Sequence, residues 1–372
     1  MSSAATPSGL EAVRQQAQLA FAASGAELSM GSLDGLPWSA GQLQALDVGD
    51  ARVCRRLDSG LTAQVFELQE GDRRWTLKRA RPRALVQNVD GQTSFLNEVQ
   101  RRIDLTALKA RDGGAARWAA IVDTQYASYR RGLILSPWID GEHVREWNER
   151  RLVQLLETVC ALWTEGLFEW DLCNGNILDD GQQLRLFDFG YMYRFDPRRH
   201  FNSAGHGTDV PLFHPAERFE TRNHSGHLLV LERSAGTAAA LQAFRLEKTV
   251  ALQAYGRMRE EIGRRGATAQ VLEWLDGIIG RWREGLRAGG EALYFAEQWR
   301  SHVLDLDDDL RGRSCTPMTL GRADWLLDTL QHHFDALRAC NALFWDDERR
   351  TQAELLARYR EQRARAENHQ LT

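Results

Sequence analysis

The chain has 372 residues, of which 43% are hydrophobic and 26% are charged, and its net charge is −4. This length is comfortable for a two-lobed enzyme, and the hydrophobic share is sufficient for a sizeable core. A slightly acidic balance with charges of both signs argues against a disordered chain. It also argues against a nucleic-acid-binding protein, which needs clustered cations to neutralise phosphates.

The cysteines and the apolar segments indicate the cellular setting. The five cysteines are scattered and form no C-x-x-C pair, so neither a disulfide framework nor a thiolate metal site is favoured. The N-terminal segment lacks the basic and apolar regions of a secretory signal, and no run of about 18 apolar residues is present to span a membrane. We therefore expect a cytoplasmic protein without a membrane span.

The first part of the chain predicts an N-terminal extension over residues 1–50 and a strand-rich lobe over residues 51–138. Apolar residues four positions apart predict one helix in this lobe, over 93–108. Glu70-Gly71-Asp72 predicts a hairpin turn. Short, partly alternating segments predict strands at 53–57, 64–68, 74–79, 119–125 and 132–138.

The rest of the chain predicts a larger, mainly helical part. The linker 136–141 leads into a strongly apolar helix over 149–165, and a stretch over 190–236 is less regular. Two short strands are expected at 177–178 and 184–187. From residue 238 the pattern is almost wholly helical, with breaks near 266, 289–290 and 313–319. We therefore divide this part into segments 139–236 and 237–372.

The segment 171–190 combines two carboxylates and an amide on loops that flank a two-stranded hairpin. The first loop reads Asp171-Leu-Cys-Asn-Gly-Asn176, and the second reads Phe187-Asp188-Phe189-Gly190. Phosphoryl transfer needs hard oxygen ligands to hold magnesium on the phosphates and a carboxylate to accept the proton of the attacking hydroxyl. Asn176 and Asp188 are candidate magnesium ligands, and Asp171 is the candidate base.

These two motifs resemble the D-x-x-x-x-N catalytic loop and the D-F-G triplet of the protein-kinase-like superfamily. The resemblance covers about residues 52–219. It implies an α+β, two-lobed fold, with a small antiparallel-sheet lobe containing one helix and a large mainly helical lobe. It further implies an ATP-dependent kinase that uses Mg²⁺ and transfers the γ-phosphoryl group to a hydroxyl acceptor.

The upstream strands offer the nucleotide-binding residues that this resemblance implies. Lys78, in Trp-Thr-Leu-Lys, looks like the strand lysine that contacts the α- and β-phosphates, and Glu98 is placed like its helical partner. Strand alternation places Thr76 on the same face as Lys78. Further nucleotide contacts are expected in the degenerate glycine loop and at the linker between the lobes: Gly60, Val65, Ser136 and Trp138.

The chain departs from the kinase pattern around the catalytic loop. Glu169-Trp170 replaces the usual His-Arg, so either Glu169 supports the loop in a different way or the loop is reorganised. Cys173 stands where a lysine near the γ-phosphate is often found. The loss of one such charge raises the transition-state barrier by about 3 kcal/mol, by analogy with other electrostatic donors. Gly207-Thr208 and Glu217 echo the end of an activation segment, and Glu217 is a candidate partner for an arginine.

Several functions remain open from the sequence. The acceptor hydroxyl belongs either to serine or threonine of a protein, which is slightly favoured, or to a small molecule or glycan. The alternatives of another class are a nucleotide-binding pseudokinase scaffold and transfer of AMP. Five histidines lie between residues 200 and 227. A zinc site usually has more closely spaced ligands that include cysteine or a carboxylate, so a metal site here is disfavoured.

Overall fold

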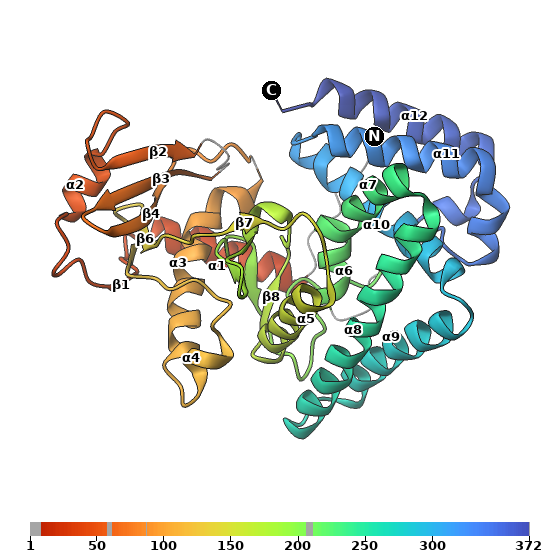
Figure 1. The fold of residues 1–372 in the computed structure, drawn as a ribbon, viewed down its shortest axis with the longest axis horizontal. Coiled ribbons are helices and arrows are strands. Elements are labelled where there is room, and N and C mark those ends of the chain that lie inside the picture. The colour runs from red at the N-terminus through yellow and green to blue at the C-terminus, as the bar shows by residue number, and fades with distance from the viewer. Residues whose placement is uncertain (1–8, 58–61, 87, 206–210, 372) are drawn as a thin grey trace. The chain divides into compact units, whose positions relative to one another are not determined.

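The computed structural model describes residues 9–57, 62–86, 88–205 and 211–371. Its contacts divide the chain into two compact units, and each is built from two stretches of sequence (Figure 1). Unit 1 comprises Met1–His143 and Gly175–Tyr193. Unit 2 comprises Val144–Asn174 and Arg194–Thr372. The chain therefore leaves unit 1 after residue 143 and returns to it for residues 175–193.

Unit 1 is organised around a six-stranded sheet in the order β1-β5-β6-β4-β3-β2, and every neighbouring pair is antiparallel. The longest strands, β3 and β4, form a tight hairpin because Gly71 takes a φ of +57°, which suits glycine in a two-residue turn. The strands are β1 (Ser29–Gly31), β2 (Val53–Leu57), β3 (Ala63–Glu70), β4 (Arg73–Ala80), β5 (Tyr126–Ser128) and β6 (Leu133–Pro137).

The two faces of this sheet carry separate apolar clusters because side chains alternate along each strand. One cluster includes Phe66 and Leu77 from the strands, packed with Trp38 and with Leu43 of helix α2 (Ala40–Ala45). On the other face, Ile134 packs with Phe95 and Val99 from helix α3 (Val89–Lys109). Segment 33–46, within the expected N-terminal extension, thus covers one face of the sheet, and α3 covers the other.

Two helices flank α3, and a small second sheet completes unit 1. Helix α1 (Gly9–Ala23) packs on α3, and the short helix α4 (Gly114–Arg117) follows it. Strands β7 (Glu142–His143), β9 (Ile177–Asp179) and β10 (Leu184–Leu186) pair antiparallel in the order β10-β9-β7. A parallel bridge between Ile121 and Leu186 ties the returning segment to the first stretch of unit 1.

Unit 2 is mainly helical. Its helix α5 (Glu149–Thr164) begins at Asn148, whose side chain accepts the Arg151 N–H, and it packs against α8. The remaining helices are α6 (Pro215–Phe219), the π-helix η2 (Glu220–His224), α7 (Ser225–Ala235), α8 (Thr237–Arg264), α9 (Ala269–Arg287), α10 (Glu291–Gly312), α11 (Pro317–Ala339), the 3-10 turn η3 (Asp347–Arg349) and α12 (Gln352–Asn368). Two short strands, β8 (Leu167–Glu169) and β11 (Met192–Arg194), and the 3-10 turn η1 (Asn174–Asn176) lie near the points where the chain changes unit.

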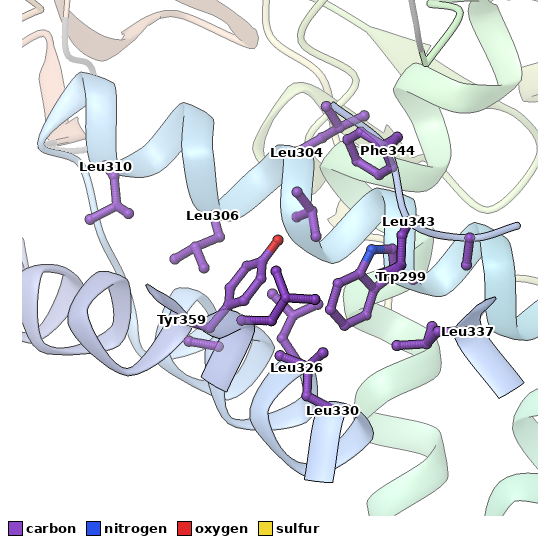
Figure 2. Close-up of a cluster of buried hydrophobic side chains, with 14 of the residues drawn as sticks. Trp299, Leu304, Leu306, Leu310, Leu326, Leu330, Leu337, Leu343, Phe344 and Tyr359 are labelled. Atoms are coloured by element: carbon purple, nitrogen blue, oxygen red, sulfur yellow. The ribbon is translucent and has the colours of Figure 1, made fainter. Parts of the chain in front are cut away.

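The last three long helices of unit 2 enclose a large apolar cluster (Figure 2). Trp299 of α10 is fully buried and meets the ring of Tyr359 from α12 at a centroid distance of 5.6 Å. Leu326 and Leu330 of α11 fill the same cluster. Capping boxes begin α11 at Thr316 and α12 at Thr351, so local side chains fix where these helices start.

The expected α+β class is confirmed, with an antiparallel sheet in the N-terminal part and a mainly helical C-terminal part. Two local predictions are wrong. The strand expected at 119–125 lies at Tyr126–Ser128, because Ile121 closes a turn with Trp118. The stretch from 215 is helical, because His214 caps α6 and Pro215 occupies its first turn. Among the described residues, no helix combines the length and apolar character that a bilayer crossing requires.

Candidate active site

The predicted lysine–glutamate pair forms between β4 and α3. Lys78 Nζ lies 2.9 and 3.0 Å from the two carboxylate oxygens of Glu98. Both side chains are almost completely buried, with exposed fractions of 8% and 3%. The pair is possible because Lys78 lies on the sheet face that α3 covers, opposite Ile134 of β6. A buried ammonium held in this way is a fixed positive charge.

Asp188 joins this pair from the returning segment. Its Oδ2 lies 2.8 Å from Lys78 Nζ, and its Oδ1 accepts the N–H of Gly190 at 3.2 Å. Burial opposes the charge of Asp188, but Lys78 and the Gly190 N–H keep the pKa of this carboxyl below its ordinary value. Burial likewise opposes the charge of Lys78, yet Asp188 and Glu98 raise the pKa of its ammonium. Lys78 and Asp188 are therefore both ionised at neutral pH.

Arg102 is a further member of this network that the sequence did not predict. One of its nitrogens, Nη2, donates to Glu98 Oε1 at 2.8 Å and also to the backbone carbonyl of Phe187. The other, Nη1, donates to the hydroxyls of Thr124 and Ser136, each at 3.2 Å. Arg102 is only 2% exposed. It lies four residues after Glu98, one helical turn further along α3, and this spacing is the signal that could have identified it.

Asn97 connects α3 to the backbone around Asp188 and was also missed. Its Nδ2 lies 2.8 Å from the carbonyl of Met192, 2.9 Å from that of Gly190 and 3.3 Å from that of Phe189. Asn97 is fully buried. The sequence signal that could have identified Asn97 is its place in the middle of the helix that carries Glu98, because a buried amide must find hydrogen-bond partners. Consecutive residues of α3 thus hold the lysine and the Asp188 loop.

The other nucleotide-binding residues predicted in unit 1 lie on or next to one face of the sheet. Val65 pairs with Lys78, and Thr76 pairs with Ser136, so these four side chains share the face that carries the lysine. The Trp138 N–H donates to the carbonyl of Arg74 at 3.0 Å, and its ring lies near the guanidinium groups of Arg55 and Arg74. Gly60 lies outside the described residues. Nucleotide contacts by these residues stay a prediction.

The two candidate magnesium ligands flank one end of the β9–β10 hairpin. Ile177 and Leu186 are register partners. Asn176 directly precedes Ile177, and Asp188 follows two residues after Leu186, so the polypeptide places both residues beyond the same end. The ionised Asp188 carboxylate and the Asn176 amide oxygen are hard ligands of the kind that Mg²⁺ prefers. The donor set therefore fits the predicted metal.

Asp171, the candidate base, belongs to unit 2, where its loop has unusual supports. Glu169, which stands in place of the usual histidine, accepts the Asp171 N–H through Oε1 at 2.9 Å. Trp170 donates through its indole nitrogen to the Ser203 hydroxyl at 2.8 Å and packs edge to face on Phe168. The replacement of His-Arg therefore leaves the loop supported. The structure also places Arg222 next to Asp171, which the sequence did not predict.

Other candidate features of the sequence resolve within unit 2. Glu217 forms a buried pair with Arg218, its neighbour on α6, at 2.8 Å. Gly207-Thr208 lies outside the described residues. Within the described part of the chain, no cluster of three or more histidine, cysteine or acidic side chains could hold a metal ion. A surface hollow of about 420 Å³ between the end of α5 and Arg198 involves none of the predicted site residues.

Comparisons with known proteins found similarity in solved structures alone: no family model matches the chain, and no curated protein matches it significantly. One similar structure is the bifunctional kinase-methyltransferase WbdD, with 16% identity, a TM-score of 0.30, and coverage of 57% of this chain and 49% of that chain. This chain thus spans about half the length of that WbdD chain. Another is the M. tuberculosis PknI kinase domain, with 12% identity, a TM-score of 0.32, and coverage of 64% of this chain and 99% of that chain. At such TM-scores neither alignment supports an inference about this chain.

Proposed function

We propose that this protein is an ATP-dependent phosphotransferase that moves the γ-phosphoryl group to a hydroxyl acceptor. The observation that carries this proposal is the contact of buried Lys78 with buried Glu98 and with the partly exposed Asp188. Burying an ammonium together with a carboxylate is costly, and a well-packed apolar cluster would be at least as stable. Such an arrangement is therefore better explained by a need for charge at a nucleotide site than by a need for stability.

Each residue of the site has a role in this reaction. Lys78 orients the α- and β-phosphates, Glu98 keeps its ammonium in place, and Arg102 holds Glu98. Asn176 and Asp188 would hold Mg²⁺, which supplies positive charge to offset that of the phosphates. Asp171 accepts the proton of the acceptor hydroxyl as the phosphoryl group is transferred. Asn97 and Glu169 hold the two loops from which Asp188 and Asp171 project.

For the acceptor we favour serine or threonine of a protein, and a small-molecule or glycan hydroxyl is the alternative. Purified protein incubated with Mg²⁺ and ATP should acquire phosphate on serine or threonine if the first is correct, and mass spectrometry would locate it. Product formation only in the presence of metabolite or glycan mixtures would favour the second.

Transfer itself is tested with ATP labelled at the α or the γ position. We expect Mg²⁺-dependent transfer of the γ label and none of the α label, and Asp188→Asn should abolish it because the main magnesium ligand is lost. Asp123→Asn is the matched control, since this exposed carboxylate pairs with Lys109 on the surface of unit 1. Transfer of the α label would indicate AMP transfer. Nucleotide binding without transfer by the unaltered protein would indicate a pseudokinase.

A further inference from the structure

The catalytic loop lacks a cation of its own, and the structure places one beside it from another element. Cys173 stands two residues after Asp171, where kinase-like loops often have a lysine. Arg222 Nε lies 3.2 Å from Asp171 Oδ1, and both residues belong to unit 2. A guanidinium is always charged at neutral pH and donates along fixed directions. It can therefore hold a carboxylate in one orientation.

Arg222 reaches this loop from η2, the π-helical turn between α6 and α7. The adjacent residue, Asn223, donates through Nδ2 to the carbonyl of Leu172 at 3.2 Å. Asn223 is itself oriented by the indole N–H of Trp147 at 3.1 Å. Two consecutive residues of η2 thus contact two consecutive residues of the catalytic loop. Single π-helical turns inside longer helices frequently mark functional sites, because the wider turn redirects side chains.

The far side of the Arg222 guanidinium is held by α10. Its Nη1 contacts Asp305 Oδ1 at 2.5 Å, while Asp305 Oδ2 contacts the Nε of buried Arg322 at 2.8 Å. Asp309 Oδ1 lies 3.7 Å from the same Nη1, and burial and the nearby Asp305 raise the pKa of Asp309 to about 6. The Asp305 carboxylate is thus shared between two arginines. Asp305 therefore positions the guanidinium of Arg222 beside Asp171.

Arg222 also keeps capacity for a further contact. Its side chain is 24% exposed and that of Asp171 is 27% exposed. Its third nitrogen, Nη2, makes no hydrogen bond with any residue that the structure describes. A structural arginine would be expected to use its full fork on protein acceptors.

We propose that Arg222 is a positioning residue that replaces the missing loop lysine: it fixes the carboxylate of Asp171 and supplies the positive charge of the catalytic loop during phosphoryl transfer. This inference rests on the proposed phosphotransferase function. The positive charge beside the catalytic loop therefore comes from η2, and Asp305 of α10 positions it.

The test compares Arg222→Ala and Arg222→Lys with the unaltered protein. For Arg222→Ala we expect kcat to fall about 100-fold, as for loss of other electrostatic donors, with an unchanged Kd for Mg-ATP. Arg222→Lys keeps the charge and should recover about tenfold of this loss. Guanidinium chloride at millimolar concentration should partly restore kcat in Arg222→Ala. Arg257→Ala is the control, because this exposed arginine pairs with Glu157 on the surface of unit 2 and its loss should leave kcat unchanged.

The possible results separate this inference from the proposed function. Unchanged kcat in Arg222→Ala would overturn the inference while leaving phosphotransfer intact. Equal losses in the alanine and lysine variants, with weaker Mg-ATP binding, a lower Tm and no rescue by guanidinium, would show a purely structural role and would also overturn it. Absence of transfer by the unaltered protein would refute the proposed function and this inference with it.

Discussion

Asn97 holds the loop that carries Asp188, because its amide lies within hydrogen-bonding distance of three carbonyls around that residue. These carbonyls are buried against α3, so they depend on protein donors. The geometry of the Asp188 loop is therefore set by a side chain that need not contact any ligand.

Asn97→Leu should lower the free energy of unfolding by about 1–3 kcal/mol, because carbonyls would lose their buried donor. It should also weaken Mg-ATP binding, since the Asp188 loop would no longer be held. Urea denaturation and calorimetric titration measure the two effects. Gln100→Leu is the matched control: this amide lies on the same helix and accepts from Gln18. Equal effects of both substitutions would contradict the assigned role of Asn97.

A second residue-scale feature is the group of buried charges behind η2. Lys248 of α8 is fully buried and contacts three carboxylates, those of Glu220, Glu247 and Glu297. Arg300 is the other cation of the group and pairs with Glu220. Burial raises the pKa of Glu247 to about 7, whereas Lys248 and Arg300 overcome burial and lower the pKa of Glu297 to about 2.

The shifted pKa of Glu247 predicts a pH-dependent stability. A carboxyl whose pKa is raised on folding stabilises the protein below its ordinary pKa, near 4.5, and this contribution is lost as pH rises through about 7. Glu247→Gln mimics the protonated form and should remove this slope. The difference in unfolding free energy between the variant and the unaltered protein should therefore change by about 3 kcal/mol between pH 4.5 and 8. If the difference in unfolding free energy, measured by urea denaturation, did not change with pH, the prediction for Glu247 would be contradicted.

Among the elements, α1 bears directly on the site because it packs on the helix that carries Glu98. Arg14 of α1 contacts Asp90 at 2.7 Å, at the start of α3, and its guanidinium lies 3.6 Å from the ring centroid of Tyr193. Gln18 donates to Gln100 at 2.8 Å further along the same helix. The N-terminal segment is therefore a structural part of unit 1 and restrains α3.

Arg14→Ala should lower the free energy of unfolding by about 2 kcal/mol, since a half-buried charged hydrogen bond and a cation–π contact are both lost. Leu19→Ala, on the exposed side of α1, should change it by less than about 0.5 kcal/mol. A double-mutant cycle between Arg14→Ala and Asp90→Asn measures the coupling directly. Additive effects of the two substitutions would show that the contact contributes nothing.

The elements also show what could be predicted from sequence. The hairpin β3–β4, helix α3 and the long helices after residue 237 follow from local periodicity and turn residues, and Lys78 and Glu98 could be located because each occupies a fixed place on such an element. The one-turn spacing from Glu98 marks Arg102 as a candidate partner of that glutamate. The carbonyl partners of Asn97 and Arg102 could not be assigned in this way, because they lie about 90 residues away and no local pattern encodes such contacts.

The helices α6, η2 and α7 were missed for a related reason. Segment 215–235 lacks regularly spaced apolar residues. Its helices depend on tertiary contacts, such as the buried pair of Glu217 with Arg218 and the hydrogen bond from Arg322 to the Thr221 carbonyl. Arg222 was missed along with them, because its role requires η2 to lie beside residue 171.

At the scale of the whole molecule, the helical end of the chain is connected to the site through α10. One side of this helix supplies Trp299 to the apolar cluster of Figure 2, and another supplies Asp305 to Arg222. The packing of α10 with α11 and α12 therefore determines where the Asp305 carboxylate lies. Residues far along the sequence contribute to the catalytic loop in this indirect way.

Trp299→Ala should lower the free energy of unfolding by about 3–5 kcal/mol, because it removes a fully buried ring from this cluster. Val230→Ala is the control, since this α7 side chain is 52% exposed and its truncation should have little effect. Thermal or urea denaturation monitored by circular dichroism gives both free energies. A loss below about 1 kcal/mol for Trp299→Ala would show that the cluster does not support unit 2.

The return of residues 175–193 to unit 1 limits how this protein can be dissected. A fragment ending at His143 would retain Lys78 and Glu98 but would lack Asp188, and Arg102 would lose the Phe187 carbonyl. Ordinary truncation therefore removes the proposed magnesium ligand along with part of the fold. A minimal nucleotide-binding fragment would have to be discontinuous, obtained by splicing residue 143 to residue 175 through a short linker or by complementing the shorter piece with a synthetic peptide.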